Sequence, residues 1–121
     1  MMKKTIQLLI TTLFFTLAST TVLANDKGVD AKQIFSNDKA SGVIITMQPG
    51  ATLPSVARPG ARAVYFIKGG KLERIYPDGK IVKKEYKDGE TAFLDKPEDQ
   101  EAYAIKNVGK TVFKAYTVTI K

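Results

Sequence analysis

The sequence predicts an all-β protein whose strands close into a small antiparallel β-barrel or jelly roll. Beyond residue 40, short runs rich in Val, Ile, Thr, Tyr and Phe alternate with turns that contain Gly or Pro. No stretch there has the length and period of an ordinary helix. About eight or nine short strands at such regular spacing are typical of a sandwich or a barrel, and a barrel leaves no exposed sheet edge.

The first 24 residues have the features of a cleaved secretory signal peptide. Lys3 and Lys4 precede an apolar run, residues 6–18, and small residues lie near Ala24. The run is shorter than the roughly 20 residues that a membrane-spanning helix needs. We therefore expect cleavage after Ala24 and a periplasmic or secreted protein that has no membrane contact after cleavage.

The length of the mature protein limits it to one domain, and its charge pattern argues against a nucleic-acid partner. Removing residues 1–24 from 121 leaves 97, enough for one modest core, and lowers the formal net charge from +7 to +5. Lys and Glu are interspersed over residues 71–90, which is typical of a solvated sheet face and not of a stripe that follows phosphates. We expect no nucleic-acid partner. Without Cys the protein has no disulfide.

The N-terminal part of the mature chain is polar, and apolar strands follow it. Residues 25–40 are expected to be a loose segment with a first strand only over 32–36, and residues 37–42 are expected to form a turn. Residues 42–48 carry apolar side chains with little alternation, which predicts a strand covered on both faces.

Residues 50–69 predict a strand, a corner at Pro59-Gly60 and a second strand. In the second strand the period of two places Arg62, Val64 and Phe66 on one face. Gly69 and Gly70 then mark a turn.

The C-terminal half predicts a hairpin and three further strands. Residues 71–76 and 80–86 flank Pro77-Asp78-Gly79, a strong hairpin signal. A strand over 91–94 is followed by a polar loop, residues 95–100. The final two strands are expected over residues 101–107 and 110–120.

The spacing between residues 50 and 69 resembles the first motif of the cupin superfamily. That motif runs Gly, five residues, His, one residue, His, three or four residues, Glu, six residues, Gly. Here it falls on Gly50, Val56, Arg58, Arg62 and Gly69. In cupins the three central side chains point into a β-barrel and hold a metal ion. The resemblance therefore implies a cupin-like barrel, a double-stranded β-helix over residues 41–121, in which the metal ligands are replaced.

The second cupin motif runs Gly, five residues, Pro, one, Gly, two, His, three, Asn, and two alignments are open after Gly89. A strict count puts Gln100 at the His position, whereas a loop three residues longer puts Tyr103 there and Asn107 at the Asn position. We prefer the second alignment, because Asn107 then precedes a Val-Gly turn and Tyr103 falls within a strand. Both alignments lack the fourth metal ligand.

The sequence contains neither His nor Cys, so imidazole and thiolate are excluded as metal ligands and as catalytic groups. We expect no transition metal and no cofactor. Asp95, Glu98, Asp99 and Glu101 offer oxygen ligands that suit calcium. They lack the Asp-x-Asp-x-Asp-Gly spacing, so we interpret them as a solvated acidic loop.

The resemblance implies that the former metal cavity is a pocket with two arginines in it. Its expected lining is Val56, Arg58, Arg62, Val64, Phe66 and Tyr103. Buried charge needs a partner. In one reading Arg58 and Arg62 bind a carboxylate or sulfate and Tyr103 donates a third hydrogen bond. In the other, an ion pair with Glu101 fills a vestigial cavity, and the sequence leaves both open.

The corner at Pro59-Gly60 decides whether Arg58 and Arg62 meet. On one straight strand four residues span about 13 Å, too far to share one carboxylate. If the chain folds back at the corner, the two arginines lie on neighbouring strands about 5 Å apart. We expect the folded-back arrangement.

The residues favour a non-catalytic, exported protein that binds a small anionic molecule in its barrel. One alternative is a metal-independent isomerase, epimerase or lyase of a sugar or sugar acid, with Tyr103, Glu101 or a lysine as its base. Another is a structural or partner-binding module. An apolar outer sheet face must be covered, either by a second copy in a homodimer or by the N-terminal segment.

Overall fold

The computed structural model describes residues 27–121, and the signal peptide expected over residues 1–24 lies outside the described residues. The described chain forms nine strands and one helix of 4 residues, and every strand pairing is antiparallel. This confirms the predicted fold class.

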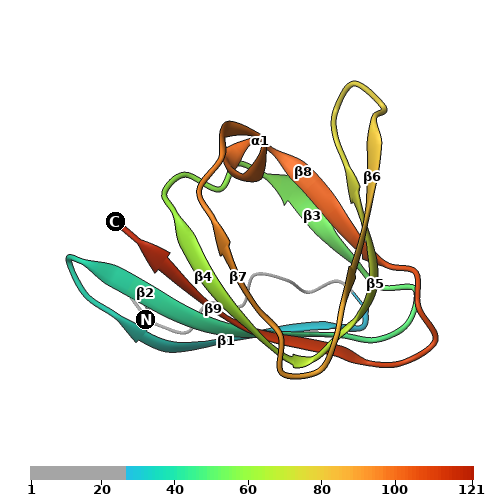
Figure 1. Ribbon diagram of the computed structural model, residues 1–121, viewed down its shortest axis with the longest axis horizontal. Coiled ribbons are helices and arrows are strands. Elements are labelled where there is room, and N and C mark those ends of the chain that lie inside the picture. The colour runs from blue at the N-terminus through green and yellow to red at the C-terminus, as the bar shows by residue number, and fades with distance from the viewer. Residues whose placement is uncertain (1–26) are drawn as a thin grey trace, which may run out of the picture.

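The strands form two sheets that face each other around the core (Figure 1). The first sheet has the order β1-β2-β9-β4-β7, with β1 (Val29–Ser36), β2 (Ala40–Met47), β9 (Phe113–Ile120), β4 (Arg62–Lys68) and β7 (Thr91–Leu94). The second has the order β3-β8-β5-β6, with β3 (Thr52–Val56), β8 (Tyr103–Asn107), β5 (Gly70–Ile75) and β6 (Ile81–Tyr86). From β2 onward the chain crosses between the sheets at almost every connection, and only the hairpin β5–β6 stays within one sheet.

The corner after β3 joins the two sheets and does not make a hairpin. Strand β3 pairs with β8, whereas β4 pairs with β7 and β9. The expectation that Arg58 and Arg62 lie on paired neighbouring strands is therefore wrong. Gly60 has a φ of +91°, and a Cβ there would meet the carbonyl oxygen of Ile120. Only glycine fits such a corner without strain.

The N-terminal segment is more ordered than the sequence suggested. Strand β1 begins at Val29, not at Lys32, and pairs with β2 from Val29 to Ser36. Val29 and Ala31 are buried against the barrel. Tertiary burial of these two small apolar side chains outweighs the polar composition around them, so residues 25–40 are not a loose segment throughout.

The core lies between the sheets and is built from the inward-facing side chains of alternating positions. On β4 Val64 and Phe66 are buried, as the period of two predicted. The Phe66 ring stacks on Tyr86 of β6 with centroids 3.8 Å apart, and it packs against Phe113 at 5.9 Å. The contact between Phe66 and Tyr86 joins the two sheets, whereas Phe113 belongs to the same sheet as Phe66.

The outer face of the first sheet keeps two aromatic side chains in contact with solvent. Tyr65 is 47% exposed and Phe93 is 56% exposed. Their strands β4 and β7 are neighbours. The homodimer expected from an apolar outer face stays a prediction.

The predicted polar loop contains helix α1 (Pro97–Gln100), which lies over one end of the barrel beside β3 and β8 (Figure 1). Between residues 27 and 121, no helix is long and apolar enough to cross a membrane.

Candidate ligand-binding pocket

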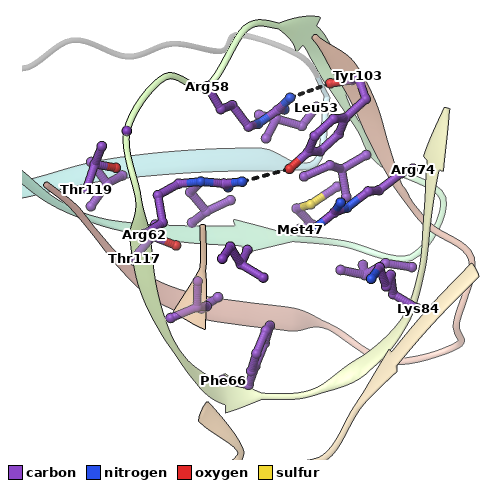
Figure 2. A pocket seen from close by; sticks show the side chains of 18 of the residues that line it. Met47, Leu53, Arg58, Arg62, Phe66, Arg74, Lys84, Tyr103, Thr117 and Thr119 are labelled. Carbon is purple, nitrogen blue, oxygen red and sulfur yellow. Dashed lines mark hydrogen bonds between the residues drawn. The ribbon is translucent and has the colours of Figure 1, made fainter. Parts of the chain in front are cut away.

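A cavity of about 620 Å³ lies between the two sheets (Figure 2). Its walls come from both sheets and are mostly apolar, with contributions from Val64, Phe66, Leu72, Ile105, Phe113 and Ala115. The lining residues Ala57, Pro59, Ile120 and Lys121 are exposed, which places the mouth of the cavity beside the β3–β4 corner and the C-terminus. A cavity of this size suits a drug-sized molecule.

Five cationic side chains line the cavity, and one of them, Lys121, lies at its exposed mouth. Arg62, at the start of β4, is 8% exposed and Arg74 of β5 is 5% exposed, while Arg58 and Lys84 are half-buried. Figure 2 shows three arginines gathered around Tyr103: Arg58 from the β3–β4 corner, Arg62 from β4 and Arg74 from β5. Because these side chains face inward, their charges need partners inside the barrel.

Tyr103 of β8 joins the three arginines. Nη1 of Arg58 donates to the backbone oxygen of Tyr103, and the guanidinium carbon of Arg58 lies 4.1 Å from the ring centroid. The guanidinium carbon of Arg74 lies 4.6 Å from the same centroid. Nη2 of Arg62 donates to the Tyr103 hydroxyl at 2.9 Å and also to the backbone oxygen of Asp99. Cation–π contact and hydrogen bonding together hold the guanidinium groups at this end of the cavity.

The carboxylate of Asp99 neutralises Arg74. Nη1 of Arg74 donates to Oδ1 of Asp99 at 2.9 Å, and the backbone of Lys96 donates to Oδ2 at 3.1 Å. Burial disfavours the charge of Asp99, but these two hydrogen bonds outweigh it, so the pKa of Asp99 lies below its ordinary value. Burial also opposes the charge of Arg74, yet hydrogen bonds to Tyr76 and Asp99 keep the pKa of Arg74 above its ordinary value.

Arg58 has no carboxylate partner among residues 27–121. Burial, together with the like charges of Arg62 and Arg74, lowers the pKa of Arg58 to about 10, although Tyr103 opposes the shift. The side chain remains charged at neutral pH because this pKa is still well above 7.

Two guanidinium nitrogens in the cavity have no hydrogen-bond partner in the described part of the chain. They are Nη2 of Arg58 and Nε of Arg62, and both atoms are buried. Buried polar groups without partners are rare in folded proteins, because each costs about 1–3 kcal/mol. The pocket thus holds two unused donors and more positive than negative charge.

The structure brings together most of the side chains that the sequence predicted for the pocket. Arg58, Arg62, Phe66 and Tyr103 all line the cavity. Val56 does not, because the β3–β8 pairing is irregular between Leu53 and Val56 and leaves Val56 50% exposed.

Glu101 is not the carboxylate partner of the arginines. It is exposed, lies outside the cavity lining and makes no ion pair within residues 27–121, because β8 begins only at Tyr103. The reading in which an ion pair with Glu101 fills the cavity is therefore wrong. The inward carboxylate is Asp99, so the acidic loop is not wholly solvated either.

Sequence reasoning missed Arg74, Asp99 and Lys84. The alternation of Leu72, Arg74 and Tyr76 was an available signal, since two apolar side chains share the parity of the arginine. Lys84 likewise shares the half-buried face of β6 with Tyr86. Nothing in the loop around Asp99 has a period that would reveal which of its carboxylates turns inward.

The alignment that puts Tyr103 at the His position and Asn107 at the Asn position of the second motif agrees with where these two residues lie in the structure. Tyr103 points into the cavity, whereas Gln100 ends α1. Asn107 is fully buried, and its amide donates to the backbone oxygens of Met47 and Thr111 while its oxygen accepts from Gly109. Asn107 therefore fixes the turn between β8 and β9.

In the part of the chain that the structure describes, no group of three His, Cys, Asp or Glu side chains is arranged to hold a metal ion. The positions at which the resemblance implies metal ligands carry Arg58, Arg62, Tyr103 and the outward Val56. Arginine is a hydrogen-bond donor only, so this donor set suits an anion and not a cation.

Comparison with solved structures agrees with this architecture. A cupin domain from Bordetella pertussis Tohama I superimposes with a TM-score of 0.69 at 16% identity, covering 81% of this chain and 98% of that chain. A cupin superfamily protein from Desulfitobacterium hafniense DCB-2 gives a TM-score of 0.57 at 15% identity, covering 82% of this chain and 83% of that one. A sugar phosphate isomerase of the cupin superfamily from Silicibacter pomeroyi DSS-3 gives 0.55 at 14% identity, covering 78% and 60%.

No protein-family model and no curated protein matches the sequence. At identities this low the similarity concerns the fold. The chain has the cupin fold, an antiparallel double-stranded β-helix.

Proposed function

We propose that this protein binds a small anionic molecule inside its barrel and does so without a metal ion. The observation that carries the proposal is the pair of buried, unpartnered nitrogens, Nη2 of Arg58 and Nε of Arg62, in a cavity of about 620 Å³. An anion would accept hydrogen bonds from both arginines and supply the negative charge that the site lacks.

The charge balance of the cavity supports an anion over a neutral molecule. The cavity lining includes five cationic residues, Arg58, Arg62, Arg74, Lys84 and Lys121, whereas Asp99, the partner of Arg74, is the one ion-paired carboxylate among residues 27–121. A neutral ligand would leave the two free donors unsatisfied and would bury Arg58 further without compensation. Binding of an anion would instead raise the pKa of Arg58 from about 10 toward its ordinary value.

The same contacts argue against two of the three bases considered for catalysis, Glu101 and Tyr103, and leave Lys84 as the remaining candidate deep in the cavity. Glu101, one of the bases considered for a sugar isomerase, is exposed and outside the pocket. The hydroxyl of Tyr103 already donates to the backbone oxygen of Asp99 and accepts from Arg62. A general base needs a free acceptor within reach of the substrate proton.

Isothermal titration of the purified protein with sodium acetate and sodium sulfate, with acetamide as the neutral control, tests the proposal. We expect saturable binding of an anion and none of acetamide. Arg62→Gln should weaken anion binding at least tenfold, whereas Lys110→Gln, which removes an exposed charge outside the cavity, should leave it unchanged. Circular dichroism controls for folding. Equal affinity of a folded Arg62→Gln variant would overturn the proposal.

We further propose that the protein acts outside the cytoplasm after removal of residues 1–24. The charged start, apolar middle and small residues near Ala24 support cleavage at that point. Mass spectrometry of protein isolated from the producing cell should find Asn25 as the first residue. A mature protein that retains Met1 would contradict this.

A further inference from the structure

The cavity changes from polar to apolar along its length. On β4 the inward side chains run from Arg62 through Val64 to Phe66, and the strand register pairs them with Thr119, Thr117 and Ala115 of β9. Each inward step on a strand advances about 7 Å, so the charged and aromatic ends of this wall are about 13 Å apart.

The same gradient continues onto β2. Strand β9 pairs Thr119 with Ser41, Thr117 with Val43 and Ala115 with Ile45, and all six of these side chains line the cavity. Hydroxyl groups therefore surround the level of Arg62, whereas aliphatic groups surround the level of Phe66. Beyond that level Met47 pairs with Phe113, and both are buried.

The opposite sheet shows the gradient in the same direction. Arg74 pairs with Ile105 near the charged end, and Leu72, one inward step further along β5, lies in the core beside Tyr86 and Phe66. Lys84, opposite Leu72, is the polar exception on this wall. In Figure 2 the arginines gather around Tyr103, and Phe66 lies at the other end of the cavity.

We propose that the ligand is an amphipathic carboxylate, with its head group at Arg58 and Arg62 and an apolar body that extends toward Phe66. This rests on the function proposed above. A carboxylate has two oxygens, so it can accept hydrogen bonds from both Arg58 and Arg62, which line the cavity and each have one nitrogen without a partner. The aliphatic and aromatic walls then bury the body of the molecule.

Two other classes of anion fit less well. A sugar acid or sugar phosphate would bury several hydroxyl groups at the level of Phe66, Ala115 and Ile45, where the first sheet offers no polar side chain and the opposite wall offers only Lys84 and Tyr86. An inorganic anion would satisfy the arginines but leave the apolar part of the cavity unfilled, so it would gain nothing from that surface.

Titration of the purified protein with octanoate, acetate and 1-octanol tests this inference. We expect octanoate to bind at least tenfold more tightly than either acetate or 1-octanol, because only octanoate uses both ends of the cavity. Acetate as tight as octanoate would overturn the amphipathic ligand and leave the anion site standing. Octanol as tight as octanoate would overturn the anion site itself, and no binding of any probe would overturn both proposals.

A pair of neighbouring substitutions on β9 locates the apolar body. Thr117→Leu narrows the middle of the cavity and should lower the ratio of octanoate to acetate affinity at least tenfold. Val118→Leu lies on the outer face of the same strand and should leave both affinities unchanged. If Thr117→Leu does not fold, Ala115→Val provides a second narrowing of the same wall. An unchanged ratio in a folded narrowing variant would contradict the inference.

Discussion

The hydroxyl of Tyr103 accepts a hydrogen bond from Nη2 of Arg62 at 2.9 Å and donates one to the backbone oxygen of Asp99 at 3.2 Å. Arg62 reaches the same backbone oxygen, so one tyrosine and one arginine close a small cycle with helix α1. The helix therefore stays over the barrel end through the side chains that line the pocket.

Tyr103→Phe should destabilise the protein by about 1–3 kcal/mol, because the substitution leaves a buried donor of Arg62 with one acceptor fewer. Urea unfolding followed by circular dichroism measures the loss. Tyr116→Phe, on the outer face of β9, is the matched control and should change stability by less than about 0.5 kcal/mol. Equal effects of the two substitutions would contradict the role of the Tyr103 hydroxyl.

Asp99→Ala should cost about 3–5 kcal/mol, because it leaves the buried Arg74 without its carboxylate. The pH dependence gives a second readout. The folded-state pKa of Asp99 lies below the ordinary value of 3.8, so its stabilising contribution is present above about pH 4 and is lost as the pH falls through the folded pKa.

Urea unfolding between pH 2 and pH 6 separates the effect of protonating the Asp99 carboxylate from the effect of removing its side chain. Wild type should lose stability faster than Asp99→Asn at acidic pH, because the variant has no carboxylate to protonate. Asp38→Asn, an exposed change in the β1–β2 turn, should follow wild type. Parallel curves for wild type and Asp99→Asn would count against the ion pair.

Asn107→Ala should destabilise the protein by about 3 kcal/mol or more, since it removes a fully buried side chain that makes three hydrogen bonds to the backbone. Asn37→Ala is a matched control. The side chain of Asn37 also accepts two backbone hydrogen bonds in a turn, but it is exposed, so its loss should cost about 1 kcal/mol or less. Thermal melts compare the two, and a larger loss in Asn37→Ala would show that burial is not the deciding factor.

Elemental analysis of protein purified without chelators should find no stoichiometric iron, zinc, nickel or manganese. The reason is the absence of His and Cys from the whole sequence. Addition of a chelator should leave the melting temperature unchanged. Stoichiometric metal that survives purification would mean that carboxylates form a site which we have not recognised.

The sequence by itself determined the fold class and the turns. Regular β-branched and aromatic runs, the Pro77-Asp78-Gly79 hairpin and the Pro59-Gly60 corner are local signals, and each lies where it was predicted. Strand parity placed Arg62 and Phe66 on the inner face, because the side-chain period of a strand holds whatever the strand pairs with.

Only the tertiary structure decided which charges meet. Arg58, Arg62 and Arg74 come together through Tyr103, although Arg62 and Arg74 lie in different sheets and Arg58 lies in the corner between the sheets. The choice of Asp99 over Glu101 depends on a short helix that turns one carboxylate toward Arg74 and leaves the other in water. Pairing between sheets and the direction of a side chain in an aperiodic loop are long-range properties, so no local pattern encodes them.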